Sequence, residues 1–292
     1  MKKNLAIWVV CLIWIMPSRA WADEIVYFDR PKLVTDKRGQ DLEFILKRVL
    51  AVTGDPYGKA GFQYTPHVMS RTRSLKEIKK GQILHVMAVH PKADWDRETI
   101  CIQFPLRKGL LSYRLFLIRK ESQSGLSGVT TLEQLRKIPT GSGQQWSITQ
   151  AFQQDRFNLV TGISYDGLFS MLNVGRFRTF SRGINEIYDE LETYRKIYPD
   201  LVIEKDLLLY VYIPTYFYVS PKKPELARRV RQGLDQLYET GEFDRIFQRF
   251  HGRKISRSRL GARRFFRIAN PNVSEERFRA DKKYLYFPGS KN

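Results

Sequence analysis

The chain has 292 residues, of which 42% are hydrophobic and 13% aromatic, and 50 Lys and Arg against 30 Asp and Glu give a formal net charge of +20. The length suits one large domain or two ordinary lobes, and the composition excludes intrinsic disorder as the state of the whole chain. A charge of this size bears on partners rather than on fold.

The first 22 residues have the order of an export signal. Lys2 and Lys3 are followed by an apolar run over 5–16, the breaker Pro17 and the small-residue site Ala20-Trp21-Ala22. This order predicts a secretory signal peptide cleaved after Ala22. The alternative is a membrane anchor, but a spanning helix needs about 20 apolar residues. Removing Lys2, Lys3 and Arg19 with the segment lowers the net charge from +20 to +17.

Strands and helices alternate through the first half of the mature chain. The patterns predict strands at 24–28, 83–89, 99–104 and 112–118, and helices at 40–52 and 74–80. The helix at 40–52 places Leu42, Ile45, Leu46, Val49 and Leu50 on one stripe. Alternation of this kind indicates an α/β fold with a largely parallel sheet.

A second α/β series follows. It contains expected helices at 131–137, 145–154, 165–174, 185–197, 224–238 and 243–250, and expected strands at 158–161, 176–180, 206–213 and 217–220. A glycine-rich turn is expected at 140–143. Pro224 suits a first helical turn, and Gly241 follows the helix that it opens.

The basic excess is concentrated near the C-terminus. From His251 onward there are 12 Lys and Arg against 3 Asp and Glu, and the chain from Arg253 has little regular patterning, so an extended tail is expected. Nucleic acid is the usual partner of such charge. Export argues against it, and an anionic envelope polymer, an acidic ligand or an acidic partner fits better.

Enzyme signatures do not emerge from the sequence. The four histidines lack paired metal-ligand spacing, and no Gly-x-Ser-x-Gly elbow is present. Asp94, Asp96 and Glu98 form an acidic cluster that is expected on a solvated loop. We therefore expect no catalytic residue, no metal and no cofactor.

Several segments resemble the periplasmic solute-binding proteins of the amino-acid type (solute-binding protein family 3), in particular a poorly characterised Gram-negative branch. The resemblance is carried by Gly-Leu-Leu-Ser-Tyr-Arg-Leu-Phe-Leu-Ile-Arg at 109–119, Tyr-Asp-Gly-Leu-Phe-Ser-Met-Leu at 165–172, the stretch 175–186, and the closing helices at 221–251. It covers roughly residues 23 to 255.

The resemblance implies a two-lobed type II periplasmic-binding-protein fold with two hinge-crossing strands. The expected lobe 1 comprises 23–110 and 214–255, the expected lobe 2 comprises 111–213, and 256–292 forms a basic C-terminal tail. It further implies a monomeric periplasmic protein, peripheral to the membrane at most, which closes on a small solute by hinge motion for uptake or sensing. An inner-membrane permease or sensor would be its partner.

The best candidate for ligand contact is Gly141-Ser142-Gly143, ahead of the helix expected at 145–154. Free N–H groups and the dipole at a helix N-terminus favour an anion, and glycines allow close approach. The resembling proteins cradle a ligand carboxylate at this turn. The alternative is an ordinary connection between two elements.

Four further residues are candidates for the cleft. Trp146 and Tyr165 could stack on a ligand or pack in the core. Arg107, just before the first crossing, could reach the cleft. Arg182 could contact the ligand, or could pair with Glu186 four residues on.

Arg182 also marks a departure from the family pattern. Amino-acid binders of this class place an acidic residue in this region to hold the ligand's amino group, whereas this chain reads Phe180-Ser181-Arg182-Gly183. An arginine suits a carboxylate or phosphate better. The expected function is therefore binding of a small polar, anionic or amino-acid-like ligand. The alternative is a non-transport interaction or sensory partner of the cell envelope.

Overall fold

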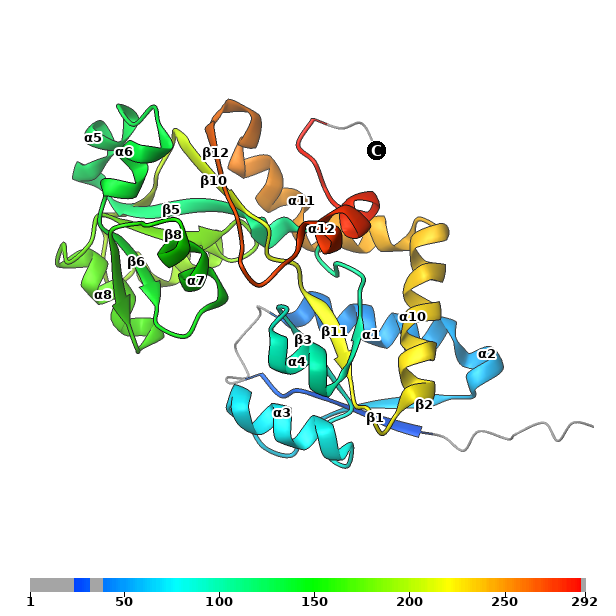
Figure 1. Ribbon diagram of the computed structural model, residues 1–292. Helices are drawn as coiled ribbons and strands as arrows, with labels where there is room; N and C mark the ends of the chain where they lie inside the picture. The colour runs from blue at the N-terminus through cyan, green and yellow to red at the C-terminus, as the bar shows by residue number, and fades with distance from the viewer. Residues whose placement is uncertain (1–23, 32–38, 290–292) are drawn as a thin grey trace, which may run out of the picture.

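The computed structural model describes residues 24–31 and 39–289. The predicted signal peptide, 1–22, lies outside the described residues. Two lobes lie side by side, each built around one β-sheet (Figure 1). None of the helices in the described part of the chain is long and apolar enough to cross a bilayer.

Lobe 1 contains a five-stranded sheet in the order β2-β1-β3-β11-β4. Its strands are β1 (Glu24–Phe28), β2 (Ala60–Tyr64), β3 (Val86–Val89), β4 (Ile100–Ile102) and β11 (Tyr216–Val219). Its helices are α1 (Gln40–Val52), α2 (Gly54–Tyr57), α3 (Arg71–Lys80), α4 (Ala93–Glu98), α10 (Pro224–Glu239) and the first half of α11 (Glu242–Ser258).

Lobe 2 contains a seven-stranded sheet in the order β12-β10-β5-β8-β6-β7, with β9 paired to β5. Its strands are β5 (Tyr113–Arg119), β6 (Thr140–Gly143), β7 (Leu159–Gly162), β8 (Thr179–Gly183), β9 (Leu201–Ile203), β10 (Leu207–Val211) and β12 (Arg264–Ile268). Its helices are α5 (Gln123–Ser127), α6 (Leu132–Lys137), α7 (Ser147–Gln154), α8 (Tyr165–Asn173) and α9 (Ile187–Tyr194). Helix α12 (Glu275–Asp281) follows β12.

Helices pack on both faces of each sheet because each sheet has two apolar faces. In lobe 1 the stripe of α1, including Ile45 and Val49, meets Val230 and Leu234 of α10 in one core. Gly233 lets these two helices approach closely, since a Cβ there would lie 2.8 Å from Val49 Cγ1. Trp95 and neighbouring residues fill the smaller core on the opposite face.

The prediction of a largely parallel sheet is wrong. Five pairs of neighbouring strands are parallel: β1–β2, β1–β3, β6–β7, β6–β8 and β10–β12. Five others are antiparallel: β5–β8, β5–β9, β5–β10, β3–β11 and β4–β11. The antiparallel strands β5 and β11 are those by which the chain enters lobe 2 and returns to lobe 1. Crossing strands therefore account for the mixed direction.

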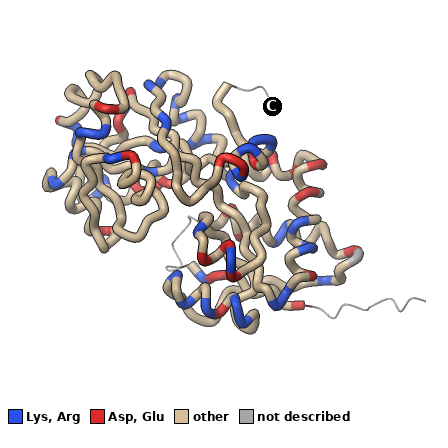
Figure 2. The backbone as a smooth tube through the Cα atoms, in the orientation of Figure 1, with Lys and Arg blue, Asp and Glu red and all other residues tan. Residues whose placement is uncertain are grey.

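Three local expectations also differ from the structure. The segment 140–143 is strand β6 rather than a turn, and the acidic cluster 94–98 lies in helix α4 rather than on a loop. Residues 256–289 do not form an extended tail, since α11 continues to Ser258 and both β12 and α12 follow. Lys and Arg are distributed over both lobes (Figure 2).

Within residues 39–289, four segments of the chain run between the lobes. The first two passages are the segments joining β4 to β5 and β10 to β11. The third is α11, whose Phe243 and Ile246 pack in the lobe 1 core while Phe247 packs in lobe 2. In the fourth, the chain leaves β12 and returns across the hinge through α12 (Figure 1).

Candidate functional site

Three parallel strands of lobe 2 end at the same edge, each on a glycine. Gly143, Gly162 and Gly183 close β6, β7 and β8, and the helices α7, α8 and α9 begin shortly after them. In open α/β sheets, ligands bind outside the carboxyl ends of the strands. This edge, which we call the glycine edge, carries most of the residues singled out from the sequence.

The structure gives the glycines of β6 a packing role. A Cβ on Gly141 would lie 2.3 Å from the Phe177 ring, and one on Gly143 would lie 2.3 Å from the Trp146 ring. Ser142 is buried, and its hydroxyl is 2.7 Å from that of Thr149. Contact of this segment with a ligand carboxylate stays a prediction.

Arg182 lies at the centre of a buried charge cluster. Its Nε donates to Glu190 Oε2 at 2.7 Å, and its Nη2 lies 3.1 Å from Glu186 Oε1, the partner four residues on. Burial opposes the charge of Arg182, but Glu186 and Glu190 raise its pKa above the ordinary value. Arg114 Nη1 also lies 3.8 Å from Glu186 Oε1, so two carboxylates face two guanidinium groups. Arg182 therefore does not present an uncompensated charge to an anion.

Two half-buried aromatic rings cover this cluster. The Arg182 guanidinium carbon is 4.5 Å from the centroid of Trp146 and 5.7 Å from that of Tyr165. Tyr165 donates its hydroxyl to Glu190 at 2.7 Å, and Trp146 stacks on Phe180. Trp146 is the residue just before α7 and not inside it. The structure therefore brings together Trp146, Tyr165 and Arg182.

Arg107 lies apart from them, at the junction of the lobes. Its Nε and Nη2 donate to the Asp41 carboxylate at 2.6 and 2.7 Å, and His251 Nε2 lies 3.1 Å from the same carboxylate. All three side chains are buried. Asp41 and His251 escaped the sequence reasoning because 210 positions separate them and neither has a local motif.

A cavity of about 40 Å³ opens between the lobes at this junction. Its lining residues are Asp41, Arg107, Asn185, Asp189, Phe250, His251 and Lys254. Asn185 Oδ1 and His251 Nδ1 are buried and have no hydrogen-bond partner among the described residues. Burial lowers the pKa of His251, and its Nε2 faces Asp41, so Nδ1 of the neutral ring is an acceptor. Both atoms thus require a hydrogen-bond donor.

The charges in this region are balanced. Lys254 Nζ is 2.5 Å from Asp189 Oδ2 and also donates to the Asn185 carbonyl at 2.7 Å, while Asp41 matches Arg107. Within residues 24–31 and 39–289, no three His, Cys, Asp or Glu side chains are arranged to hold a metal ion. The junction can therefore hydrogen-bond a small polar group that carries N–H or O–H donors.

His90, at the end of β3, makes the structure sensitive to acid. Its Nδ1–H donates to the Pro214 carbonyl at 2.9 Å, and burial lowers the His90 pKa to about 4. Arg71 and Arg107 oppose its protonation, whereas Glu186 favours it. As the pH falls, His90 is protonated near its ordinary pKa of 6.5 in the unfolded chain, but only near pH 4 in the folded chain. Folding stability due to His90 is therefore lost as the pH falls from 6.5 to about 4.

Replacing His90 by asparagine, which keeps a donor for Pro214, should flatten the pH dependence of stability. The expected loss in the unmodified chain is at most about 3 kcal/mol over this range, as measured by urea unfolding between pH 7 and pH 4. His85 and His251, whose pKa values burial also lowers, supply the remaining slope. Replacement of the exposed His67 by glutamine is the matched control. A His90→Asn slope as steep as that of the unmodified chain would contradict this account.

No family model and no curated protein matches the sequence. Solved structures match the fold. An ancestral arginine-binding protein bound to glutamine is 12% identical, with a TM-score of 0.56 over 79% of this chain and 99% of that chain. A histidine kinase sensor domain with similarity to periplasmic binding proteins is 16% identical, with a TM-score of 0.54 over 79% and 96% of the two chains.

A third structure comes from work on glutathione import through GshT and the cystine importer of Streptococcus mutans. It is 13% identical, with a TM-score of 0.54 over 79% of this chain and 96% of that chain. At these identities the likeness concerns the fold alone. It confirms the predicted fold class: the chain has the two-lobed type II periplasmic-binding-protein fold.

Proposed function

We propose that the chain is a periplasmic solute-binding protein of family 3, from its Gram-negative branch, which binds a small polar ligand between its lobes without altering it. The ligand would then be passed to an inner-membrane permease or signalled to a membrane sensor. The fold supports this proposal, as do the export signal read from 1–22 and the absence of enzyme motifs from the sequence. The observation that carries it is the polar cavity at the lobe junction.

The ligand class follows from the chemistry of that cavity. Asn185 Oδ1 and His251 Nδ1 are both acceptors, so they favour a group with N–H or O–H donors, such as an amino, amide or hydroxyl group. One water molecule occupies about 10–15 Å³ of a cavity measured in this way. The cavity of about 40 Å³ therefore suits a small polar group of the ligand rather than a whole large solute. Since carboxylates already match Arg107 and Arg182, an amino-acid-like ligand is favoured over a simple anion.

A thermal-shift screen tests the function directly. Amino acids, amides, dicarboxylates, sugars and phosphates are compared at millimolar concentration, with glutamate and glutarate as a matched pair that differs in the amino group. A ligand at 100 times its Kd stabilises the folded state by about 2.7 kcal/mol. We expect stabilisation by one or more amino compounds and none by the matched carboxylate lacking nitrogen. A response to dicarboxylates alone would refute the ligand class.

Two variants locate the site once a stabilising solute is found. Asn185→Ala removes a hydrogen-bond acceptor at the junction cavity. The affinity of this variant for the solute should fall about tenfold, which is the upper range for the loss of one hydrogen bond. Trp146→Ala tests the glycine edge. Gln154→Ala, at an exposed position of α7, is the control. An effect of Trp146→Ala without one of Asn185→Ala would move the site to the glycine edge.

The second candidate function is a non-transport partner protein of the envelope. It is favoured by the C-terminal segment, which contacts both lobes: β12 pairs with β10 of lobe 2, and Tyr284 packs in the lobe 1 core. Failure of every solute in the screen to raise the melting temperature would favour this function over solute delivery.

A further inference from the structure

Two residues adjacent in the chain are buried in the cores of different lobes. Tyr284 packs in lobe 1, with its ring centroid 4.5 Å from that of Phe104 and 4.9 Å from that of Tyr238. Leu285 is buried in the lobe 2 cluster. We call residues 264–287 the strap. Its first part, β12, pairs with β10 over five residues of the lobe 2 sheet.

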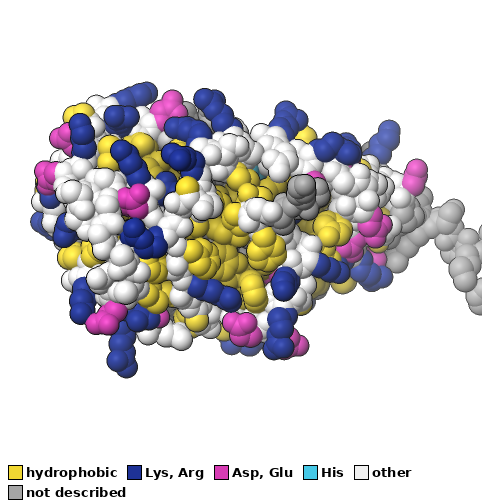
Figure 3. All heavy atoms as spheres, turned by 90° about the horizontal axis from the view of Figure 1, so that it is seen from above, with side chains coloured by type: hydrophobic (Ala, Val, Ile, Leu, Met, Phe, Trp, Pro, Cys, Tyr) yellow, Lys and Arg dark blue, Asp and Glu magenta, His cyan; other side chains and the backbone are white. Residues whose placement is uncertain are grey.

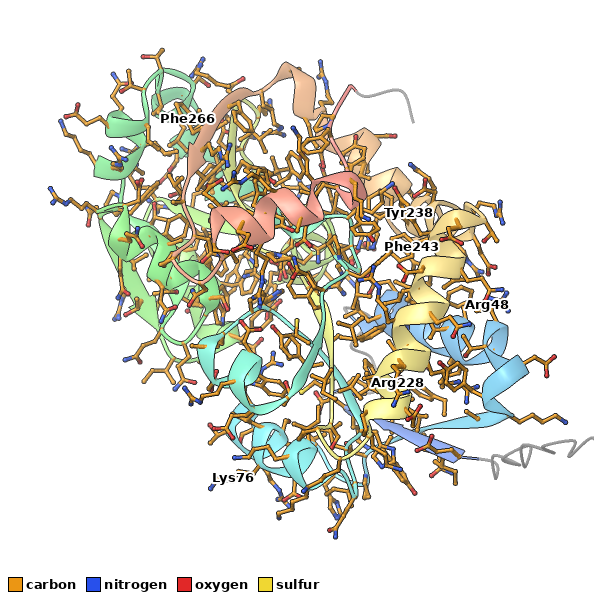
Figure 4. The ribbon with its side chains drawn as sticks, turned by 45° about the vertical axis from the view of Figure 1, so that its right-hand side comes forward. Arg48, Lys76, Arg228, Tyr238, Phe243 and Phe266 are labelled. Atoms are coloured by element: carbon orange, nitrogen blue, oxygen red, sulfur yellow. The ribbon has the colours of Figure 1, made fainter. Side chains whose placement is uncertain are left out.

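The strap is therefore anchored in lobe 2 through β12 and Leu285, and in lobe 1 through Tyr284. Figure 4 shows Phe266 of β12 in lobe 2, far from Tyr238 and Phe243. The strap returns to lobe 1 beside Tyr238, which Tyr284 contacts. Arg277 in α12 adds a second lobe 1 contact, since its Nη1 donates to Asp96 Oδ2 of α4 at 2.9 Å. Viewed from above, the face with α11, β12 and the strap has apolar side chains at its centre and Lys and Arg around them (Figure 3).

The strap also binds the first hinge passage. Tyr286 N donates to the Lys108 carbonyl at 2.8 Å, and Tyr113 donates its hydroxyl to the Tyr286 carbonyl at 2.9 Å. Lys108 and Gly109 are both left-handed, with φ of 48° and 71°. Leu285 lies directly on Gly109, where a Cβ would be 3.0 Å from Leu285 Cδ2. A change of backbone angle at 108–109 must therefore displace the strap.

The second hinge passage is bound in the same way. Asn270 Nδ2 donates to the Tyr212 carbonyl at 2.8 Å. The buried Asp281 carboxylate accepts the hydroxyls of both Tyr212, at 2.5 Å, and Tyr216. Gln103 Nε2 donates to the same carboxylate at 3.2 Å. One acidic side chain of the strap thus holds groups from both passages.

We propose that the strap is a built-in restraint which fixes the angle between the lobes. Hinge motion is absorbed by a few residues between elements, and here those residues are the ones that the strap binds. The lobes therefore move relative to each other only when the lobe 1 anchor at Asp281 and Tyr284 is released. No ligand takes part in the strap contacts, so the restraint does not depend on solute binding.

The test is a measurement of interlobe distances by double electron–electron resonance on the chain from Asp23 onward, without the predicted signal peptide and its Cys11. Spin labels are placed at Lys76→Cys in α3 and Gln154→Cys in α7, two exposed positions in different lobes (Lys76 is labelled in Figure 4). Burial raises the pKa of the Cys101 thiol to about 12, so this half-buried cysteine labels slowly and is left in place.

Three variants decide the outcome. Tyr284→Ala and the milder Asp281→Asn weaken the lobe 1 anchor, and each should broaden a narrow distance distribution or add a second population. Leu135→Ala, which removes a buried side chain of α6 from the lobe 2 core outside the strap, is the control and should leave the distribution narrow. Circular dichroism establishes that each variant is folded. Unchanged distances in both folded anchor variants, or equal broadening in Leu135→Ala, would overturn the proposal.

Discussion

Replacing Arg182 by methionine should lower the free energy of unfolding by about 3–5 kcal/mol, the usual result of breaking a buried ion pair from one side. The substitution leaves Glu190, which is 4% exposed, without its guanidinium partner. It also removes the cation that lies between the rings of Trp146 and Tyr165. Urea denaturation at pH 7 measures the loss.

A second substitution separates charge burial from lost packing. In the double variant Arg182→Met, Glu190→Gln the uncompensated buried charge is removed, and Glu186 keeps Arg114 as its partner. We therefore expect recovery of a substantial part of the lost stability. Lys137→Ala breaks the pair with Glu133, in which the Lys137 and Glu133 side chains are 74% and 72% exposed, and should leave the stability almost unchanged. A loss for Arg182→Met no larger than that of this control would show that the cluster contributes little.

Replacing Asp41 by alanine should also lower the free energy of unfolding by about 3–5 kcal/mol, because it leaves the buried Arg107 without its carboxylate partner. Burial works against ionisation of Asp41, but Arg107 and His251 hold its pKa well below the ordinary 3.8. A group with a depressed folded pKa stabilises the fold above its unfolded value. That contribution is lost as the pH falls below about 4 towards the folded pKa.

The stability difference between the unmodified chain and Asp41→Ala should therefore shrink as the pH falls below about 4. Urea unfolding of both proteins across this range gives the difference directly. Glu121→Ala, at an exposed pair with Arg119, is the control for general acid effects. A difference that grows as the pH falls below 4 would be incompatible with an ionised, paired Asp41.

Elements with a clear apolar period were predictable from the sequence. Helix α10 was expected at 224–238 and spans Pro224–Glu239, because a first-turn proline and a regular stripe mark it. Strand β12 was missed because Phe266 and Ile268 point inward between the exposed Phe265 and Arg267, within a strongly basic stretch. The burial of alternate residues in this strand depends on its pairing with β10, which is distant in the sequence and gives no local signal.

The candidate site was predictable only where partners are close in sequence. The spacing of Arg182 and Glu186 indicated their pairing, but Glu190 reaches Arg182 from helix α9, and its contribution had no local signal. The pairing of Arg107 with Asp41 joins residues 66 positions apart. Glycines in β6 suggested a turn, whereas the rings of Phe177 and Trp146 occupy the space that side chains would take.

The position of Tyr284 and Leu285 has a consequence for the order in which the molecule is made. Synthesis delivers residues 24 to 258 first, yet the lobe 2 sheet gains its edge strand only with 264–268, and the lobe 1 core gains Tyr284 later still. Contacts of such high sequence separation form late and slowly. Both lobes are thus completed by the same few residues, and a chain that is still emerging exposes apolar surface in each of them.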